Sequence, residues 1–386
     1  MRKKKSILFV RPDYHCSFFY REQFRKLGWK ADIFLPRDYP EGLLYSDKDL
    51  LKPLQFVDKS IFILKVINHF LFILWWLTKF WRYKYHFYYS PPPAVNLLES
   101  RTKIHRIFGS GFLFELFLAK LFKVKLIYLS SGCLEDETKE NFMKLDQGNV
   151  CNNCGLWNKC DDKINKNNFS IINRYFDMVV GFGCIDSTQM KMTHFKYKSI
   201  DLSLWNPNLI IPSDFILPST NNIRILHSNY LSKSGRDFMN RNIKGSPFIL
   251  AAIERLKNEG HSVEYFFIQD KPSNQMRFYQ AQADIVVEQL IYGWWGSTFV
   301  ETSALGKPVV CYLRPAWKDF FLKTFPEYSN LPVVEANTQT IYDVLKKLVT
   351  DADYRRQKGE ESRRFAEAHF DPEKNTAKLI NLLEVL

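Results

Sequence analysis

The stretch ADIVVEQLIYGWWGSTFVETSALGKPVVCY, residues 283–312, is the most informative part of this 386-residue chain. Apolar runs at residues 285–289 and 308–312 predict two buried β-strands. Between them, residues 298–305 have the pattern of a helix that ends at Gly306. A strand that leads into a helix and then into a second strand is the repeating unit of a parallel α/β sheet.

The loop before the predicted helix has the features of a phosphate site. Gly293 and Gly296 allow the backbone to approach a ligand closely. The amides of Gly296, Ser297 and Thr298 lie at the N-terminus of the helix, where unpaired N–H groups and the helix dipole favour an anion. Glu301 follows one turn later, where its carboxylate can accept hydrogen bonds from the vicinal hydroxyls of a ribose.

The same alternation of apolar runs and helical patterns covers almost the whole chain. Further strands are predicted at residues 7–10, 31–35, 85–89, 125–129, 178–180, 223–227 and 262–268. Further helices are predicted at residues 18–27, 60–80, 112–122, 247–258, 338–349 and 353–386, the last interrupted by Pro372. Prolines and polar residues in 205–222 indicate a linker. We therefore predict two α/β domains, residues 1–205 and 206–386, with the ligand at the carboxyl ends of their strands, in the cleft between them.

Composition narrows the class of protein. An apolar share of 46% excludes an intrinsically disordered chain. The net charge of +13 favours anionic partners, namely phosphates, nucleic acid or an acidic membrane surface. The apolar run 7–10 is too short for the core of a secretory signal, so we expect a cytoplasmic protein.

Residues 283–312 also resemble the donor-site signature of glycosyltransferase family 4. In that family a strand beginning with Ala-Asp precedes a Glu-Gly-x-Gly loop, a second glutamate eight residues after the first, and Gly-x-Pro-Val. The positions that match are Ala283, Asp284, Tyr292, Gly296, Glu301, Gly306, Pro308 and Val309. Gly293 stands at the first glutamate position. Trp294 and Trp295 follow it, and Trp295 either stacks on the donor or packs in the core.

Two upstream segments extend the resemblance to residues 200–386. Lys244 and Gly245 match a Lys-Gly pair at the start of a helix, and Arg241 lies a few residues earlier, with Arg236 as its competitor. In the family both cations contact the donor diphosphate, and a departing diphosphate needs its charge neutralised. The segment IDLSLWNP, residues 200–207, matches the entry into the linker.

The resemblance implies a GT-B fold, with two Rossmann-like domains whose parallel sheets face each other across a cleft. It implies a final helix that packs back on the N-terminal domain. The expected reaction is transfer of a sugar from a nucleotide-sugar donor to a glycan or lipid-linked acceptor, with retention and without a metal. Lys244 and Glu301 are the predicted catalytic residues, and no nucleic acid is expected. On the acceptor side we predict His105, Ser131 and Glu135.

Other functions stay open from the sequence alone. A GT-B epimerase or hydrolase shares the donor site, and a pseudoenzyme that only binds a donor is compatible with Gly293. A basic nucleic-acid-binding protein with a zinc knuckle agrees with the charge and the cysteines. The Asp-x-Asp triplets at residues 47–49 and 351–353 lie in helix-capping contexts and do not indicate a catalytic metal.

Four cysteines, Cys133, Cys151, Cys154 and Cys160, lie in one polar segment. Two thiolates separated by two residues can bind one ion, so the segment predicts a structural zinc in a Cys-rich insertion of the first domain. An iron–sulfur cluster or a loop without metal remain as alternatives.

The apolar segment 61–77 has three possible roles. Lys65, Asn68 and His69 interrupt it, and a transmembrane span needs about 20 apolar residues. A core helix with a narrow polar stripe is the first interpretation. The second is a helix that lies on an anionic bilayer, with aromatic and basic residues of 75–84 at the interface.

Overall fold

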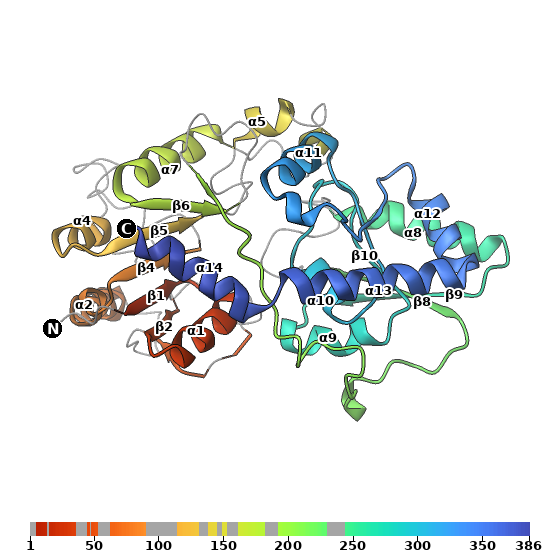
Figure 1. The fold of residues 1–386 in the computed structure, drawn as a ribbon, viewed down its shortest axis with the longest axis horizontal. Helices are drawn as coiled ribbons and strands as arrows, with labels where there is room; N and C mark the ends of the chain where they lie inside the picture. The colour runs from red at the N-terminus through yellow and green to blue at the C-terminus, as the bar shows by residue number, and fades with distance from the viewer. Residues whose placement is uncertain are drawn as a thin grey trace. The chain divides into compact units, whose positions relative to one another are not determined.

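The computed structural model describes residues 5–13, 15–35, 45–46, 48–52, 62–89, 114–130, 138–144, 149–152, 161–181, 192–229 and 244–386. These residues belong to two compact units, each of which is described on its own (Figure 1). The first unit comprises Met1–Thr138, Asp161–Tyr197 and Thr376–Leu386. The second comprises Lys139–Cys160 and Lys198–Asn375.

A parallel sheet of seven described strands forms the first unit, in the order β3-β2-β1-β4-β5-β6-β7. The strands are β1 (Ser6–Val10), β2 (Lys30–Phe34), β3 (Leu50–Leu51), β4 (Tyr85–Tyr88), β5 (Lys125–Leu129), β6 (Met178–Gly181) and β7 (Thr193–His194). The order reverses between β1 and β4, as in doubly wound nucleotide-binding folds.

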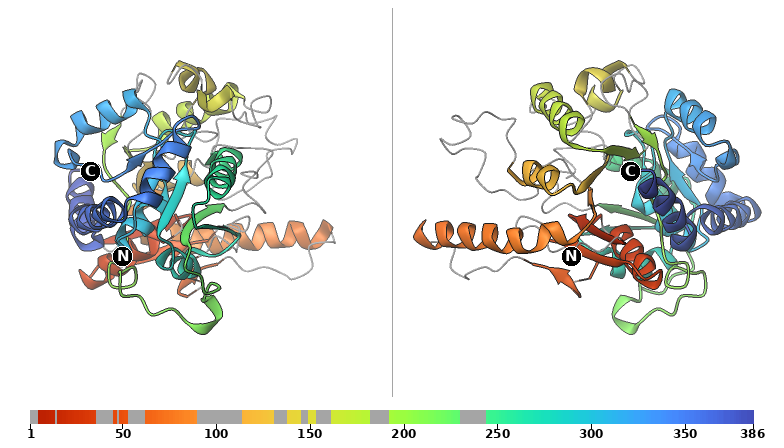
Figure 2. Two further views of the ribbon diagram at one scale, coloured as in Figure 1. Left: turned by 90° about the vertical axis from the view of Figure 1, so that its right-hand side faces the viewer. Right: turned by 60° about the vertical axis from the view of Figure 1, so that its left-hand side comes forward.

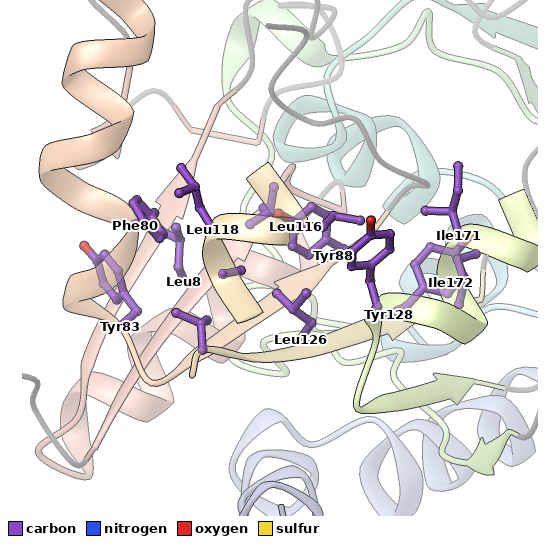
Figure 3. Packing of buried hydrophobic residues seen from close by; sticks show 14 of the residues in the cluster. Leu8, Phe80, Tyr83, Tyr88, Leu116, Leu118, Leu126, Tyr128, Ile171 and Ile172 are labelled. Carbon is purple, nitrogen blue, oxygen red and sulfur yellow. The ribbon is translucent and has the colours of Figure 1, made fainter. Parts of the chain in front are cut away.

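Helices cover both faces of this sheet. On one face, Leu8 and Val10 of β1 pack with α2 (Phe62–Lys79), α4 (Phe114–Leu121) and α7 (Asp162–Tyr175). Figure 3 shows this cluster, in which leucines of α4 meet strand residues and the end of α7. The alternate β1 residues, Ile7 and Phe9, pack on the other face against α1 (Cys16–Lys26) and α14 (Pro372–Glu384). Because neighbouring strand residues point to opposite faces, this alternation produces three layers.

The C-terminal helix completes the first unit. Leu379 and Leu383 of α14 are fully buried in the same cluster as Phe24 of α1. In Figure 1 the blue α14 accordingly lies beside the red α1.

The second unit contains a parallel sheet of five strands, in the order β12-β11-β10-β8-β9. The strands are β8 (Ile223–Asn229), β9 (Val263–Gln269), β10 (Ile285–Gln289), β11 (Val309–Cys311) and β12 (Val334–Glu335). The helices are α5 (Lys139–Lys144), α6 (Asn149–Asn152), α8 (Ser246–Asn258), α9 (Ser273–Ala281), α10 (Ser297–Ala304), α11 (Pro315–Thr324), α12 (Ile341–Thr350) and α13 (Ala352–His369).

The prediction of two parallel α/β sheets is confirmed. Three longer helices, α7, α9 and α11, were not expected from the sequence. Helix α7, DKINKNNFSIINRY, is rich in asparagine, which has a low helix propensity. Phe169 and Ile172 bury one face of it, so tertiary packing rather than propensity stabilises this helix.

The division into units differs from the predicted boundary. It falls between Tyr197 and Lys198, and Lys139–Cys160 groups with the second unit. Trp205, the first residue of the expected linker, is fully buried, and its carbonyl accepts a hydrogen bond from Arg363.

Helix α2 projects from the sheet of the first unit (Figure 2). Asn68, one residue of the expected polar stripe, is buried, whereas the apolar residues Ile67, Phe70 and Leu74 are exposed. The helix is therefore not wholly buried in the core. The side chains of Lys65 and His69, which also belong to the expected stripe, lie outside the described residues. None of the helices described is long and apolar enough to cross a membrane.

Candidate functional site

The second sheet reverses its strand order beside β8, which pairs with β9 on one side and β10 on the other. In parallel α/β sheets, ligands bind beyond the carboxyl ends of the strands at this switch point. The chain after β8 reaches Lys244 and helix α8, and the chain after β10 leads to Gly293 and helix α10. Lys244, Gly293 and the start of α10 therefore lie at the edge where a ligand is expected.

A β-bulge sets the direction of Glu288. Val287 of β10 pairs with Val310 of β11, but the next pair is Gln289 with Cys311, so Glu288 is the extra residue. Bulges re-aim a side chain and are frequent near active sites. The Glu288 carboxylate points to the start of α10, where its Oε1 accepts a hydrogen bond of 2.7 Å from the Gly296 amide.

Glu288 also has an unusual electrostatic environment. Its side chain is 1% exposed. Burial raises the pKa of the Glu288 carboxyl, a rise opposed by the Lys244 charge and by the amides of Gly296 and Phe299. The Glu301 charge raises this pKa further. Lys244 and Glu301, the two predicted catalytic residues, thus lie close enough to Glu288 for their charges to act on it.

Steric constraints explain why position 293 is a glycine. Its φ is +84°, a left-handed conformation that favours glycine. A Cβ at this position would lie 2.8 Å from Cβ of Arg314. Arg314 is fully buried and donates hydrogen bonds to the carbonyls of Tyr292 and Gly293. This backbone therefore excludes a glutamate where the family pattern has its first one.

The two tryptophans of the loop pack in the core. Trp295 is 5% exposed and stacks on both Trp294 and Phe299, with ring centroids 4.3 and 4.7 Å apart. Trp294 also stacks on Trp317. Of the two roles open from the sequence, packing is the one that the structure gives Trp295, because aromatic neighbours cover its ring.

Glu301 lies in α10 and is 4% exposed. Gln280, at the buried end of α9, donates a 2.9 Å hydrogen bond to its Oε2. This hydrogen bond holds the Glu301 carboxylate in one orientation. A carboxylate must be held in a fixed orientation to bind two adjacent hydroxyls well.

Lys244 precedes α8 in a tight turn. The next residue, Gly245, has a φ of +73°, and a Cβ there would lie 2.9 Å from Cβ of Leu290. The Leu290 amide donates to the Lys244 carbonyl, so the turn is tied to the chain after β10. Glycine thus lets the Lys244 turn and the Glu288 segment approach each other closely.

A buried histidine holds the start of α8. His227 lies between the Val287 carbonyl and the Ser246 hydroxyl, with both hydrogen bonds at 2.8 Å. Burial and the Lys244 charge lower the pKa of His227 to about 3. The ring is therefore neutral, and it joins β8, β10 and α8 without adding charge.

The sequence analysis missed two residues of this site. Glu288 was not singled out because it lies in an apolar run, but a lone carboxylate in a predicted buried strand is a signal that could have identified it. Lys198 donates a 3.3 Å hydrogen bond to the Ser297 hydroxyl and adds a second cation at the start of α10. Gly296, Ser297 and Thr298 are partly exposed there.

Several predicted site residues lie outside the described residues. They are Arg241, His105, Ser131, Glu135, Cys133, Cys154 and Cys160. Cys151 is partly exposed in α6, and the described ranges contain no group of three or more histidine, cysteine or acidic side chains that could hold a metal. Asp351 caps α13 by accepting from the Tyr354 amide, which agrees with the capping interpretation of residues 351–353.

Comparison with known proteins supports the fold. No protein-family profile matches the sequence, and no curated protein matches it. The crystal structure of HepE from Anabaena in complex with UDP-glucose is similar, with a TM-score of 0.55 and 12% identity over 99% of this chain and 100% of that chain. Sucrose-phosphate synthase from Thermosynechococcus elongatus gives a TM-score of 0.58 and 12% identity over 99% and 98%. The chain therefore has the fold of GT-B glycosyltransferases.

Proposed function

We propose that this chain is a glycosyltransferase that transfers a sugar from a nucleotide-sugar donor to a glycan or lipid-linked acceptor. The observation that carries the proposal is the arrangement at the switch point of the second sheet. There a buried Glu301, a Lys244 turn and the start of α10 come together on a GT-B fold. A helix N-terminus with nearby cations suits a diphosphate, and a fixed carboxylate suits a ribose.

The proposed roles follow from charge. Glu301 accepts hydrogen bonds from the ribose hydroxyls of the donor. Lys244, and Arg241 by resemblance, neutralise the diphosphate as it departs, and Lys198 adds positive charge near Ser297. The bond between the sugar and the diphosphate breaks, a bond to an acceptor oxygen forms, and the departing phosphate takes the acceptor proton. Two lysines at the proposed diphosphate site support a transfer without a metal. Retention is proposed from the resemblance alone, and both are to be tested.

A donor screen tests the proposal directly. UDP-glucose is the first candidate because HepE, a similar structure, contains it. UDP-, GDP-, TDP- and CMP-sugars should be compared by thermal shift, since a ligand at a hundred times its Kd stabilises the folded state by roughly 2.7 kcal/mol. One class of nucleotide should raise Tm, and the matching sugar should be transferred. Absence of binding by every donor would refute the proposal.

Product analysis separates the enzymatic alternatives. A transferase forms a new glycosidic bond and releases a nucleoside diphosphate only slowly without an acceptor. An epimerase returns an isomeric nucleotide sugar, and a hydrolase releases free sugar at full rate in water. The remaining alternative is a basic nucleic-acid-binding protein, which filter binding of nucleic acid at several salt concentrations tests.

An anionic bilayer is the proposed partner surface of the first unit, and a peripheral position on the inner face of the membrane is the proposed location. Six of the nine large apolar residues that are exposed among the described residues of this unit lie on or beside α2 and α4. They are Ile67, Phe70, Leu74, Phe117, Leu121 and Phe122, whereas Leu27, Ile164 and Val385 lie elsewhere in the unit. Phe122 contacts Phe80 at the end of α2, so the two helices present neighbouring surfaces. Lys79, Arg82 and Lys123 lie beside these residues and favour anionic headgroups.

A structural zinc in the Cys133, Cys151, Cys154 and Cys160 segment is the final part of the proposal. Elemental analysis of protein purified without added metal should find about one zinc per chain, the stoichiometry of a four-thiolate site. A Cys154→Ser variant should lose it. Metal-free protein that is fully folded would contradict this prediction.

A further inference from the structure

Helix α5 brings a distant part of the sequence to the loop that precedes α10. We call this loop, residues 292–296, the donor loop. The chain on either side of Lys139–Cys160 belongs to the first unit, but Lys139–Cys160 itself groups with the second unit. Helix α5 has six residues, too few to be stable in isolation, and Phe142 is its buried residue. The helix is therefore held in place by the residues against which Phe142 packs.

Phe142 packs against the donor loop and its support. The Phe142 ring centroid lies 5.7 Å from that of Tyr292, the first residue of the loop, and 6.5 Å from that of Trp317 in α11. The Cζ atom of Arg314 lies over the Phe142 ring at 5.2 Å and over the Trp317 ring at 4.9 Å. Two aromatic rings therefore flank the fully buried guanidinium, and one of them comes from α5.

Arg314 in turn fixes the backbone of the donor loop. Its guanidinium donates a hydrogen bond to the Tyr292 carbonyl, and its amide donates to the Gly293 carbonyl at 2.8 Å. The Arg314 side chain also fills the space beside Gly293, where the φ is +84°. The loop ends at Gly296, where the residues that start α10 are partly exposed. The position of Arg314 therefore determines how the amides at the start of α10 are presented to a ligand.

The Phe142 ring stabilises the buried charge of Arg314. A guanidinium over an aromatic face is attracted to the ring, and the attraction is strongest where water is excluded. Phe142 supplies one aromatic face and covers the guanidinium on that side. Without this ring, water can reach the guanidinium and compete for it with the carbonyls of the loop. The docking of α5 and the order of the donor loop are therefore coupled.

We infer that α5 is a brace for the donor loop and that Phe142 is a positioning residue for donor binding. Phe142 acts through Arg314, which holds the loop so that the amides at the start of α10 are ready to bind the diphosphate. Coupling between two events is reciprocal, so a bound donor should also stabilise the docking of α5. The inference rests on the proposed function, because it concerns the same donor site.

Substitution of Phe142 tests this inference by calorimetry with UDP-glucose, or with the nucleotide sugar that the donor screen identifies. Phe142→Leu keeps an apolar side chain but removes the ring. Its affinity for the donor should fall roughly tenfold, the effect of losing one desolvated contact between a cation and a ring. Phe142→Tyr keeps the ring and should bind the donor like wild type.

Phe278→Leu is the matched control in the same unit. The Arg277 guanidinium lies over the Phe278 ring at 4.8 Å, and the ring stacks on Phe215, with centroids 4.8 Å apart. This substitution therefore also removes a ring from an arginine, but from one outside the donor loop and its support. Phe278→Leu should keep the wild-type affinity for the donor.

Hydrogen exchange supplies a readout that a purely structural role of Phe142 would not change. In wild-type protein, donor binding should slow the exchange of the amides of Lys139–Lys144, because the ordered loop holds α5 more firmly. In Phe142→Leu the donor should no longer protect these amides. Circular dichroism and urea unfolding should show that both leucine variants are folded. If Phe142→Leu does not fold, the exchange experiment on wild-type protein decides.

The outcomes separate this inference from the proposed function. A wild-type affinity in Phe142→Leu would overturn the role of Phe142 and leave the donor site standing. Equal losses of affinity in Phe142→Leu and Phe278→Leu, or in Phe142→Leu and Phe142→Tyr, have the same meaning. Donor binding that leaves exchange in α5 unchanged would overturn the coupling. If wild-type protein binds no nucleotide sugar, the proposed function fails and this inference fails with it.

Discussion

The two units have the same kind of sheet, but their central strands carry different side chains. Buried aromatic residues recur on the central strands of the first unit, namely Phe9, Tyr85, Phe87, Tyr88 and Tyr128. The central strands of the second unit carry aliphatic residues, namely Ile225, Leu226, Ile285, Val286, Val287, Val309 and Val310. Narrow aliphatic strands and glycine turns allow the backbone segments after β8 and β10 to approach each other closely.

This difference shows what kind of site each unit builds. In the second unit the backbone makes the site, through the bulge at Glu288 and the positive φ angles of Gly245 and Gly293. Substrate groups common to many donors, such as a diphosphate, suit a backbone site. The apolar surface of the first unit is made by side chains on α2 and α4, which suits a bulky, apolar partner.

The largest expected effect comes from adding a methyl group at Gly293. Gly293→Ala combines a φ of +84° with a Cβ 2.8 Å from Arg314. Positive φ costs about 1–2 kcal/mol, and overpacking adds typically 1–3 kcal/mol. Urea unfolding should therefore show a loss of roughly 2–5 kcal/mol in the free energy of unfolding.

Gly260 provides a matched control in the same unit. Its φ is +85°, but no atom lies within 4 Å of the position of an added Cβ. Gly260→Ala should cost only about 1–2 kcal/mol. Equal losses in the two variants would mean that Arg314 moves aside freely, and that the loop is not fixed by packing.

The segment around Gly293 also shows how much of this site the sequence predicts. Strand β10 and helix α10 were predicted to within a residue, because apolar runs and glycine turns are local signals. The packing of Trp295 depends on α11 and α13, which lie later in the chain, so no local pattern reports it. The same holds for Glu288, whose role depends on a register shift against β11.

Lys244→Ala should give the second effect, on turnover. Lys244 is proposed to stabilise the charge that develops on the departing diphosphate, so its loss should lower kcat more than it weakens donor binding. Removing one such electrostatic contact typically costs about 10²–10³ in rate. Steady-state kinetics and calorimetry measure the two quantities, with Lys257→Ala on the exposed end of α8 as the control. If the Lys244→Ala variant keeps the wild-type kcat, Lys244 has only a structural role in its turn.

Glu301→Gln should weaken donor binding by about 1–3 kcal/mol, the cost of losing charge-assisted hydrogen bonds. The amide keeps the shape of the side chain, and Gln280 can still donate to its oxygen. Calorimetry with UDP-glucose measures the effect. A donor lacking the ribose hydroxyls should lose little further affinity in this variant, whereas a wild-type affinity for UDP-glucose would remove Glu301 from the ribose site.

The smallest effects concern the surface of the first unit. Phe70 is 60% exposed on α2, and Leu121 is 63% exposed at the end of α4. If these side chains enter a bilayer interface, each buried part contributes about 1 kcal/mol, so Phe70→Ser or Leu121→Ser should weaken liposome binding roughly fivefold. Each nearby Lys or Arg adds about 1 kcal/mol on an anionic surface, so Lys123→Glu should also weaken binding.

The second unit supplies the control that sharpens this comparison. Ile210 is 86% exposed there, so Ile210→Ser removes an even more exposed apolar side chain from the unit that holds the proposed donor site. Liposome flotation should show no change for this variant. Salt should reduce the binding of wild-type protein without abolishing it. Dissolved ions screen charges beyond a Debye length of ~8 Å at physiological ionic strength, but they do not screen apolar contacts. Equal losses for Ile210→Ser and Phe70→Ser would show that adhesion follows exposed apolar area in general. The α2–α4 surface would then have no special part in reaching a lipid-linked acceptor.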